Sequence, residues 1–585
     1  MTAAAPDVTW TPPGAGTWIC DRSHCAPAPT RLYRRIAGEH TAPIYREVMQ
    51  RFGGAVGSID LQFVNGALYR RIVPLIAPDR DTGKVPPAPL LWLVTRLHPE
   101  FRRREQTARR VLDERGFESE IDHWNAVERF EWIETNTELQ AIEPESLDDR
   151  RLADHLRHLG RRLIVGWRRH HELHANDLGP IGDLLIHARR WGIDEVEVME
   201  LLRGSSPATT AAADHGARIA DALHRGGVDP ATITGVDDMR SIAEAADALD
   251  TYLGEFGNRL VTDYDIEGLT LHELPAAVVT LVQRSAGGPT EPAALDTGID
   301  FDDMRSRADD LELFDQLLAS ARRAYGMRDD NGPLTWAWPA GITRRAYLAA
   351  GRRLADRGGL DRSEYVFELD IDELADMLDG SSRFSADELA DRAAHRRWEA
   401  TLDAPDVLGP APVEPDTSPL PPSIRRMMDI ILATTELLEP EVVDTGAPAE
   451  LTGLAQRSPE LTGLAKRSPE LTGLGIGSEP YVGTARIVAN AAEAVEQLAP
   501  GDVLITAWTS PSFNAVLSIA GAVVVQEGGL LCHAAVMARE LGIPAVIGCH
   551  DAMATIRSGQ TVEVDPVAGT VRPALPFASG VLGPQ

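Results

Sequence analysis

Apolar residues recur at three- and four-residue spacing through most of residues 85–400, and this spacing is typical of amphipathic helices. The stretch SLDDRRLADHLRHLGRRLIVGWRRHHELHA opens with Ser146 as the expected N-cap and has Asp in its first turn. The periodicity continues in MRSRADDLELFDQLLASARRAYGM (304–327) and in TRRAYLAAGRRLADRGG (343–359), which ends on a Gly pair typical of a helix C-terminus. The pattern therefore predicts a mostly helical region.

The pattern differs before this region. Residues 1 to about 80 are interpreted as a mixture of Pro- and Gly-rich loops and short apolar runs. Within them, IDLQFVNGALYRRIVPL (59–75) contains an Asn-Gly pair between two short apolar runs, which predicts two strands joined by a tight turn. A small β portion should therefore accompany the helices.

Near the C-terminus, short apolar runs alternate with helical segments. The expected strands are YVGTARIV, DVLITAW, GAVVVQEG, PAVIG and TVEVDPVAGTVRP, and the expected helices are NAAEAVEQL, SPSFNAVLSIA and HAAVMARELG. These elements predict a compact β/α unit over residues 473–574.

A Pro-rich segment and an internal repeat separate the two parts. LDAPDVLGPAPVEPDTSPLPPS (402–423) is expected to hold no regular element, and IRRMMDIILATTELL after it reads as a short helix. A ten-residue repeat, ELTGLAQRSP and its variants, then runs three times from Glu450 to Glu479, which favours an expanded, mobile linker. The predicted division is a mostly helical substrate-binding domain (1–401), a linker with a short helix (402–472), a β/α domain (473–574) and a tail (575–585).

The net charge of the chain argues against one class of partner. The formal charge is −31 at pH 7 and the pI is about 4.9. Such a surface repels phosphate backbones, so we expect no nucleic-acid partner. No apolar run is long enough to span a bilayer, and the opening MTAAAPDVTWTPPGAGTW has neither the basic nor the apolar part of a signal peptide. We expect a cytoplasmic protein with no membrane contact.

Four cysteines do not form a disulfide framework in a chain of 585 residues. Cys20 and Cys25 flank His24, but their spacing matches no zinc-binding pattern. The sequence therefore predicts no metal site on this chain.

One histidine stands where a helix is expected to begin. Gly528 and Gly529 end a strand, Cys532 occupies the N-cap position, and His533 opens HAAVMARELG. The N–H groups of a helix N-terminus favour an anion, and a neutral imidazole is a competent nucleophile. Two interpretations follow from these residues: a histidine that accepts a phosphoryl group, or a helix-start histidine that bonds a carbonyl.

The surrounding stretch GGLLCHAAVMARELGIPAVIG (528–548) closely resembles the phosphohistidine signature of the swivelling domain in the phosphoenolpyruvate-utilising enzymes. This family includes phosphoenolpyruvate synthase, pyruvate phosphate dikinase and rifampicin phosphotransferase. GIGSEPYVGTARIV, LAPGDVLITAWTSPSFNAVL and SGQTVEVDPVAGTV look like the beginning, middle and end of that domain. Besides the histidine, the residues that match the motif are Gly529, Arg539, Gly542, Pro544 and Gly548.

The resemblance implies that His533 is the phospho-acceptor, with Gly529, Cys532 and Arg539 stabilising the phosphate. Cys532 departs from the family pattern, which usually has Ser or Thr before the histidine. Because a thiol is a poorer hydrogen-bonding cap than a hydroxyl, this residue could slow or tune phosphotransfer.

Upstream segments resemble the helical substrate domain of rifampicin phosphotransferase and related synthases. They are DRSHCAPAPTRLY, FGNRLVTDYDIEGLTLHELPAAVVTLV, ARRAYGMRDDNG and GRRLADRGGLDRSEYVFELDIDELADML. The implied fold is multidomain α+β, with a mostly helical substrate domain and a C-terminal swivelling β/β/α phosphohistidine domain.

Two modules of full-length relatives are not expected here. An ATP-grasp domain would precede the helical region and a phosphoenolpyruvate barrel would follow the His domain, and no Gly-rich phosphate loop followed by Lys is present. The His-bearing subunit of phenylphosphate synthase is similar in architecture. The resemblance thus implies a phosphotransferase component that takes its phosphoryl group from a separate ATP-grasp protein, with Mg²⁺ and ATP bound by that partner, and passes it to a small-molecule hydroxyl or phenol. The alternative is an inactive or regulatory small-molecule-binding module, and phosphoenolpyruvate stays open as the donor.

The helical region offers further candidate substrate groups. His170 and His174 are four residues apart, so they share one face of the expected helix. Three interpretations stay open: a pair of metal ligands, a base that activates the acceptor, or solvated surface residues. Arg323, Arg328 and Asp329 form either a clamp for the incoming phosphoryl group or a helix-end ion-pair cluster.

Two further carboxylates, Asp263 and Asp265 in TDYDIEG, stand close together in the sequence. A polar turn is the expected structure, with a cation site as the alternative.

Overall fold

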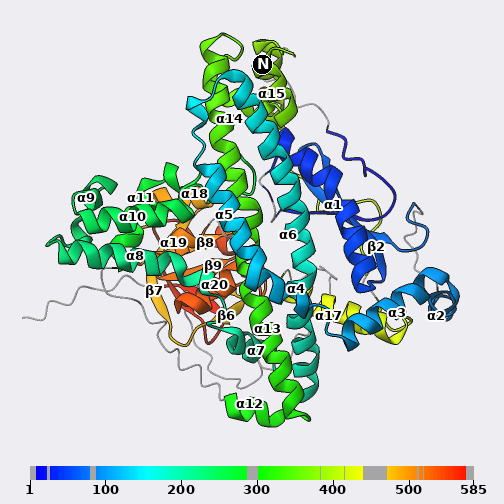
Figure 1. The fold of residues 1–585 in the computed structure, drawn as a ribbon. Coiled ribbons are helices and arrows are strands. Elements are labelled where there is room, and N and C mark those ends of the chain that lie inside the picture. The colour runs from blue at the N-terminus through cyan, green and yellow to red at the C-terminus, as the bar shows by residue number, and fades with distance from the viewer. Residues whose placement is uncertain are drawn as a thin grey trace, which may run out of the picture.

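The computed structural model shows a large helical unit against which a smaller β/α unit is docked (Figure 1). It describes residues 8–22, 25, 27–79, 87–285, 301–381, 384–413, 416–438, 471–509, 513–517 and 519–574. The repeat up to residue 470 and the tail from residue 575 lie outside the described residues. The multidomain α+β class is confirmed, whereas the predicted domain limits stay a prediction.

Helices form most of the first unit, and their bounds follow the hydrophobic periodicity. They are α1 (Arg31–Phe52), α2 (Ala88–Leu97), α3 (Pro99–Asp113), α4 (Glu118–His123), α5 (Arg129–Gln140), α6 (Asp149–Trp191), α7 (Glu195–Leu202), α8 (Pro207–Arg225), α9 (Val236–Arg240), α10 (Ala243–Phe256), α11 (Pro275–Ser285), α12 (Phe301–Arg307), α13 (Leu311–Gly332), α14 (Trp338–Asp356), α15 (Ile371–Asp379), α16 (Ala386–Glu399) and α17 (Pro422–Leu438). Shorter helical turns are η1 (Trp124–Glu128), η2 (Pro144–Ser146), η3 (Pro230–Thr232), η4 (Leu271–Glu273), η5 (Pro333–Ala337) and η6 (Ser363–Glu368).

The 43-residue helix α6 runs through the centre of this unit. Its N-cap is Asp148, whose carboxylate accepts the Arg151 N–H at 2.8 Å, so the expected cap at Ser146 is wrong. Ser146 instead ends the preceding turn η2, where its hydroxyl donates to the Glu143 carbonyl. Asp fits the N-cap equally well, because its side chain also accepts from the first helical turn.

Two other helix predictions compare differently with the structure. The periodic stretch 304–327 is divided between α12 and α13, and α13 begins after an N-cap at Asp310. The predicted helix end at the Gly pair is confirmed: Gly358 has a φ of +75°, and the Gly359 N–H donates to the Leu354 carbonyl at 2.8 Å.

The expectation of loops and short runs before residue 80 is wrong at α1, a 22-residue helix that contains Gly38 and Pro43. Both residues are unfavourable in the interior of a helix, so a prediction based on the sequence pattern misses α1. Burial of one face overrides this preference, with Ile36, Ile44 and Val48 in the core.

The predicted hairpin is confirmed as β2 (Val56–Val64) and β3 (Ala67–Pro74), joined at Asn65 and Gly66 with φ of +46° and +82°. These strands belong to an antiparallel sheet of order β2-β3-β1-β4, with β1 at Trp18–Cys20 and β4 at Val407–Leu408. The Pro-rich stretch therefore does hold a short strand, because β4 adds to the β1 edge through residues that lie between its prolines.

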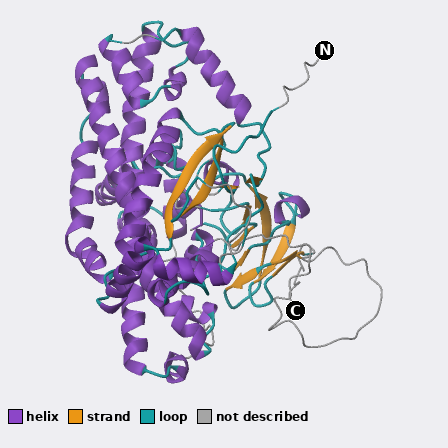
Figure 2. Ribbon diagram, turned by 90° about the vertical axis from the view of Figure 1, so that its right-hand side faces the viewer, coloured by secondary structure: helices purple, strands orange, loops and turns teal. Residues whose placement is uncertain are grey.

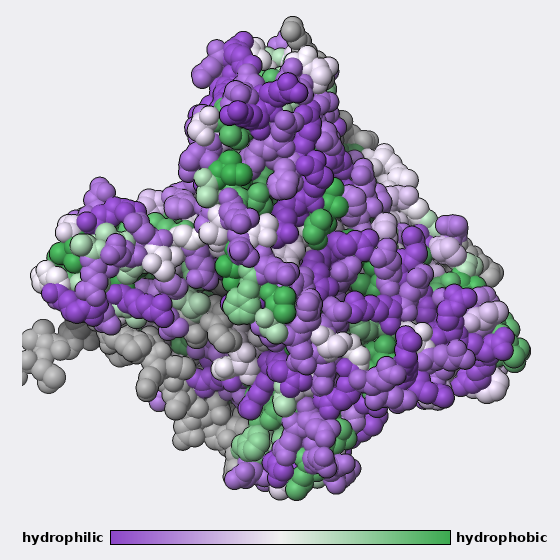
Figure 3. All heavy atoms as spheres, viewed as in Figure 1, coloured by the Kyte–Doolittle hydropathy of each residue, from purple (hydrophilic) through white to green (hydrophobic). Residues whose placement is uncertain are grey.

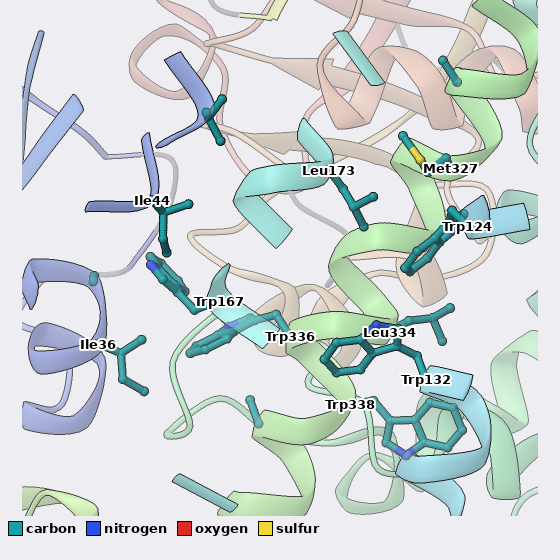
Figure 4. Close-up of a cluster of buried hydrophobic side chains, with 14 of the residues drawn as sticks. Ile36, Ile44, Trp124, Trp132, Trp167, Leu173, Met327, Leu334, Trp336 and Trp338 are labelled. Carbon is teal, nitrogen blue, oxygen red and sulfur yellow. The ribbon is translucent and has the colours of Figure 1, made fainter. Parts of the chain in front are cut away.

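Tryptophans fill the centre of the helical core. Trp167 and Trp336 pack with ring centroids 4.9 Å apart, and Tyr33 of α1 lies 5.7 Å from Trp167. Figure 4 shows Trp167 of α6 and Trp336 side by side, with Ile36 and Ile44 of α1 on one side of them. This packing joins α1, α6 and the α13–η5–α14 segment.

Gly166 is the position where α6 comes closest to this segment. A Cβ added there would overlap the backbone carbonyl oxygen of Thr335. We expect Gly166→Ala to lower the free energy of unfolding by about 3 kcal/mol, because backbone on both sides would have to move. Gly38→Ala, in a helix where an added Cβ meets nothing within 4 Å, should instead raise it by about 0.5–1 kcal/mol. Denaturant unfolding of both variants tests the pair, and equal effects would contradict the predicted close packing.

The C-terminal unit is built on an eight-stranded sheet of order β5-β12-β11-β7-β8-β9-β10-β6. The segment β7-β8-β9-β10 is parallel, and the remaining pairs are antiparallel. The strands are β5 (Leu471–Thr472), β6 (Leu474–Ile476), β7 (Tyr481–Ile487), β8 (Val503–Thr506), β9 (Ala522–Val525), β10 (Ala545–Ile547), β11 (Thr561–Asp565) and β12 (Thr570–Pro573). Its helices are α18 (Ala491–Gln497), α19 (Asn514–Leu517), α20 (His533–Leu541) and α21 (Ala552–Thr555). Each predicted strand of this unit is present, and so are the predicted helices NAAEAVEQL and HAAVMARELG. The predicted helix SPSFNAVLSIA (510–520) is described in part, as α19, and its residues 510–512 and 518 lie outside the described residues.

The two units contact each other at the segment that precedes and includes α20. Leu530, Leu531 and Val536 are buried and belong to the core of the helical unit. The Leu531 N–H donates to the carbonyl of Leu437 at the end of α17, at 2.7 Å. Figure 2 shows the helices gathered on one side and the strands of the two sheets on the other. The N-terminus of α20 therefore lies between the units.

The face of the molecule shown in Figure 3 is mostly hydrophilic, with isolated hydrophobic patches among the coloured residues. Among the residues that the structure describes, no helix has both the length and the apolar character needed to cross a membrane.

Candidate functional site

His533 is the first residue of α20, and local backbone geometry places it there. Cys532, the N-cap, is extended, and the helix ends at Gly542 in the left-handed conformation. Gly528 has a φ of +116°, and a Cβ added there would lie 2.8 Å from the Cys532 sulfur. Gly528 therefore allows the chain to turn tightly between β9 and α20.

The imidazole of His533 lies between the two units. Its Nδ1 is 3.2 Å from the Thr509 hydroxyl, in the loop after β8. Burial lowers the pKa of His533 to about 3, and the positive charge of Arg328 on α13 adds to this effect. The ring is therefore neutral at physiological pH, the state in which imidazole is nucleophilic.

Arg328 is the group of the helical unit whose charge acts on His533. Its Nη1 is buried and has no hydrogen-bond partner within the part of the chain that the structure describes. A buried guanidinium N–H without an acceptor is costly, and an oxygen of a phosphoryl group would satisfy it. The structure thus brings together two of the predicted residues, 205 positions apart in the sequence, in an arrangement suited to phosphate.

We expect Arg328→Met to raise the pKa of His533 while leaving it below 6.5. The variant removes the nearby positive charge, but burial, the larger cause of the shift, persists. A pH titration of the His533 ring proton signals by NMR measures the change. An unchanged pKa would contradict the proximity of the two side chains.

The other predicted phosphate-stabilising residues lie around the loop that holds His533. The Gly529 N–H donates to the Leu438 carbonyl at 3.3 Å, which places it at the contact between units. Arg539 is 1% exposed and donates from Nη1 to the Leu530 carbonyl at 2.6 Å, with its Nε 3.6 Å from Glu200. Arg539 therefore stabilises the loop before α20.

Cys532 makes no capping hydrogen bond through its side chain. Burial raises the pKa of its thiol, so the sulfur is neutral at physiological pH. Because the sulfur packs close to Gly528, this residue contributes to the shape of the turn.

The predicted clamp residues separate in the structure. Arg323 is exposed and pairs with Glu118 at 3.4 Å and Asp122 at 3.5 Å, one turn or more from Arg328 on α13. Asp329 acts on α20, because its negative charge is one of the causes that raise the pKa of Glu540. Of the three, Arg328 is the residue that faces His533.

The histidine pair of α6 forms an ordered chain of contacts. His170 Nε2 lies 3.1 Å from His174 Nε2, and His174 Nδ1 lies 3.2 Å from Oδ2 of Asp177. Within the described residues, no group of three or more His, Cys, Asp or Glu side chains could hold a metal ion. The roles that the sequence suggests for His170 and His174 stay predictions.

Asp263 and Asp265 occupy the polar turn that the sequence favours. Asp265 accepts hydrogen bonds from the Thr30 N–H at 2.5 Å and the Thr30 hydroxyl at 2.7 Å. Burial, with the negative charge of Asp263, raises the pKa of Asp265 to about 7. Asp265 thus fixes the N-cap residue of α1.

Sequence reasoning missed several residues at the docked face. Both carboxylate oxygens of Glu540 accept the Gly204 N–H, at 3.0 and 3.1 Å, and burial raises the pKa of this carboxyl to about 7. Tyr325, one turn before Arg328, is 2% exposed. Thr509 carries no signal beyond the general resemblance, because a Thr in a loop is common.

The comparisons with known proteins agree with this geometry. Residues 498–569 match the family model described as PEP-utilising enzyme, mobile domain. The match includes His533, the loop before it and the strands β8, β9, β10 and β11 of the C-terminal sheet.

Curated relatives extend the likeness beyond the mobile domain. The chain is 44% identical over 82 residues to a phosphoenolpyruvate synthase of Synechocystis sp., covering 14% of this chain and 10% of the relative. It is 40% identical over 94 residues to the phosphoenolpyruvate synthase of Escherichia coli, covering 16% and 12%. Similarity to the rifampicin phosphotransferase of Streptomyces sviceus reaches 27% identity over 343 residues, covering 56% and 34%.

This last alignment is longer than the whole C-terminal unit, so it also includes part of the helical unit. The chain spans about a third or less of the length of these relatives.

Proposed function

We propose that this protein is a phosphotransferase component that carries a phosphoryl group on His533 from a nucleotide-binding partner to a small-molecule hydroxyl or phenol. The observation that carries the proposal is the position of His533 between the units, where its ring is neutral and under the charge of Arg328, whose Nη1 is buried. The matched mobile domain and the names of the relatives, a phosphotransferase and two synthases, support the same reaction class.

Nδ1 of His533 is engaged by Thr509, so we assign the phosphoryl group to Nε2. When His533 is phosphorylated, Arg328 neutralises charge on the phosphoryl oxygens and fixes their direction. Transfer of the phosphoryl group to the acceptor then takes place in the docked arrangement, because the N-terminus of α20 faces α13 of the helical unit.

Loading requires a second arrangement. Leu530, Leu531 and Val536 bury the α20 segment against the helical unit, which restricts access to His533. We propose that the mobile domain leaves this position to meet a separate ATP-grasp protein in the cytoplasm, where Mg²⁺ and ATP are bound by that partner. Mg²⁺ would neutralise charge on the nucleotide during phosphoryl transfer.

The test is intact-protein mass spectrometry with peptide mapping. The protein is incubated with ATP and Mg²⁺, with phosphoenolpyruvate, and with ATP, Mg²⁺ and a co-purifying ATP-grasp protein. We expect an acid-labile phosphoryl group on the peptide that contains His533 when the partner is present. No label with an active partner would favour an inactive or regulatory binding module instead.

A further inference from the structure

We propose that α2 and the turns of α3 that follow it bind the surface of an anionic lipid bilayer. The apolar side of α2 enters the lipid, and the arginines of α3 lie at the headgroups. Binding of this kind goes beyond the proposed phosphotransfer and does not depend on it. It differs from the expectation of no membrane contact, which came from the lack of a spanning segment and of a signal peptide. A helix that lies on a bilayer needs neither.

The burial of α2 is the reverse of what its sequence predicts. The helix has the sequence APLLWLVTRL, and its buried residue is Thr95. Four large apolar side chains are exposed instead: Leu90 (52%), Trp92 (49%), Leu93 (46%) and Leu97 (62%). In an ordinary surface helix the apolar side faces the core. The helix α2 therefore presents its apolar side outward.

Polar contacts hold the other side of α2 on the protein. The Thr95 hydroxyl donates to the Pro419 carbonyl at 3.0 Å, and Nη1 of Arg96 donates to the same carbonyl at 2.9 Å. The guanidinium of Arg96 also lies 4.2 Å from the centroid of the Trp92 ring. These contacts fix which side of α2 faces outward, so the exposure of its leucines is a property of the fold.

The exposed leucines form one stripe on a projecting helix. Leu90, Leu93 and Leu97 are spaced by three and four residues, which places them on one face of α2. Figure 1 shows α2 at one extremity of the helical unit, with α3 beside it. Figure 3 shows hydrophobic atoms at the same right-hand edge. A stripe in this position can enter a flat lipid surface without obstruction by the rest of the helical unit.

The charge beside this stripe is opposite in sign to anionic headgroups. Residues 87–112 contain six arginines and two glutamates, in a chain whose formal charge is −31. The exposed arginines of α3 are Arg102, Arg103, Arg109 and Arg110. Arg102 and Arg110 form no ion pair within the part of the chain that the structure describes. Their charges are therefore available to an anionic partner.

The two glutamates of α3 bond groups of the protein itself. Glu105 accepts the Ser423 N–H at 3.1 Å and the Ser423 hydroxyl at 2.8 Å, at the beginning of α17. Glu100 accepts a hydrogen bond of 3.0 Å from Arg104, which is buried. The next acidic residue in the chain is Asp113, the last residue of α3. Over the preceding turns, the outward charge of α3 is carried mainly by arginines.

The negative charge of the whole chain does not cancel this local attraction. Interactions between exposed charges are screened beyond about 8 Å at physiological ionic strength, so distant carboxylates act weakly on a surface that touches α3. A nucleic acid would attract the same arginines, but it would leave the leucines of α2 in water. A second copy of the chain in a symmetric contact would cover the leucines but bring like charges together. An anionic bilayer satisfies both the apolar stripe and the arginines.

The test is co-sedimentation of the full chain with lipid vesicles. One set of vesicles is phosphatidylcholine alone, and the other is phosphatidylcholine with phosphatidylserine. Leu93→Ser is compared with Leu311→Ser, a matched control because Leu311 is 43% exposed at the start of α13. Arg102→Gln is compared with Arg362→Gln, whose side chain is 60% exposed. Circular dichroism and light scattering report the fold and the mass of each protein.

We expect the wild type to sediment with the phosphatidylserine vesicles and much less with phosphatidylcholine alone. Leu93→Ser should lower the affinity about tenfold, because a leucine side chain no longer enters the lipid. Arg102→Gln should lower it about fivefold, since each basic residue near an anionic surface adds a similar attraction. Both control variants should bind like the wild type, and added salt should weaken binding.

A wild type that does not sediment with phosphatidylserine vesicles, or equal losses in Leu93→Ser and Leu311→Ser, would overturn the proposal. Equal binding to both kinds of vesicle would overturn the assignment to an anionic surface. A dimer that becomes monomeric in Leu93→Ser, without vesicle binding, would assign the stripe to a second copy of the chain instead. Each of these results leaves phosphorylation of His533 to its own test.

Discussion

His533→Asn is expected to take no phosphoryl group from any donor, while the fold and the docked arrangement persist. The asparagine amide lies close to the place of Nδ1 and can keep the contact with Thr509, which is 3.2 Å from that atom in the native protein. It lacks a nucleophilic nitrogen, so the covalent intermediate cannot form. Peptide mapping after incubation with the nucleotide-binding partner measures the loss.

The matched control is His550→Asn, the same substitution at an exposed histidine of the same unit. This variant should load to the wild-type level. Label that persists on His533→Asn would show that another residue carries the phosphoryl group, and the proposed role of the α20 N-terminus would then be wrong.

The parts of the fold that the sequence reveals are those governed by local rules. Turn geometry at Asn65–Gly66 needs positive φ, and the period of apolar residues in α6 follows from burial of one helix face. The C-terminal unit was predictable for the same reason, since short apolar strands between Gly and Pro residues have few alternatives. Local reasoning failed at α1, where burial in the core outweighs the unfavourable Gly38 and Pro43.

The candidate site shows the same limit. The position of His533 follows from a short contiguous motif, whereas its environment comes from residues far away in the sequence. The Glu540 contact with Gly204 spans 336 residues, and Arg328 of α13, whose charge acts on His533, is also far from it in the sequence. Periodicity reports which face of a helix is buried and not which helix covers it, so Arg328 could be named as a candidate but not placed at His533.

Leu531→Asp is expected to release the mobile domain from the helical unit and to raise the pKa of His533 from about 3 to near 6.5, its value in water. Leu531 is fully buried in the helical core, and its N–H bonds the Leu437 carbonyl. A carboxylate at this place is destabilised by several kcal/mol, and about 1.4 kcal/mol changes an equilibrium tenfold. The docked population should therefore fall by about 100-fold or more.

The sign of the pH effect follows from the same shift. Docking lowers the pKa of His533 from about 6.5 to about 3. Between these two pH values the imidazole gains a proton only when the mobile domain is released, so docking weakens as the pH falls from 6.5 toward 3. Above pH 6.5 the imidazole is neutral in both states, and docking does not depend on its protonation. An NMR titration of His533 in wild type, Leu531→Asp and Leu474→Asp measures this directly. Leu474 is 42% exposed in the same unit, so its variant should titrate like the wild type. A low pKa that survives in Leu531→Asp would mean that burial of His533 arises within the mobile domain itself, and the contact between units would then have no part in tuning the nucleophile.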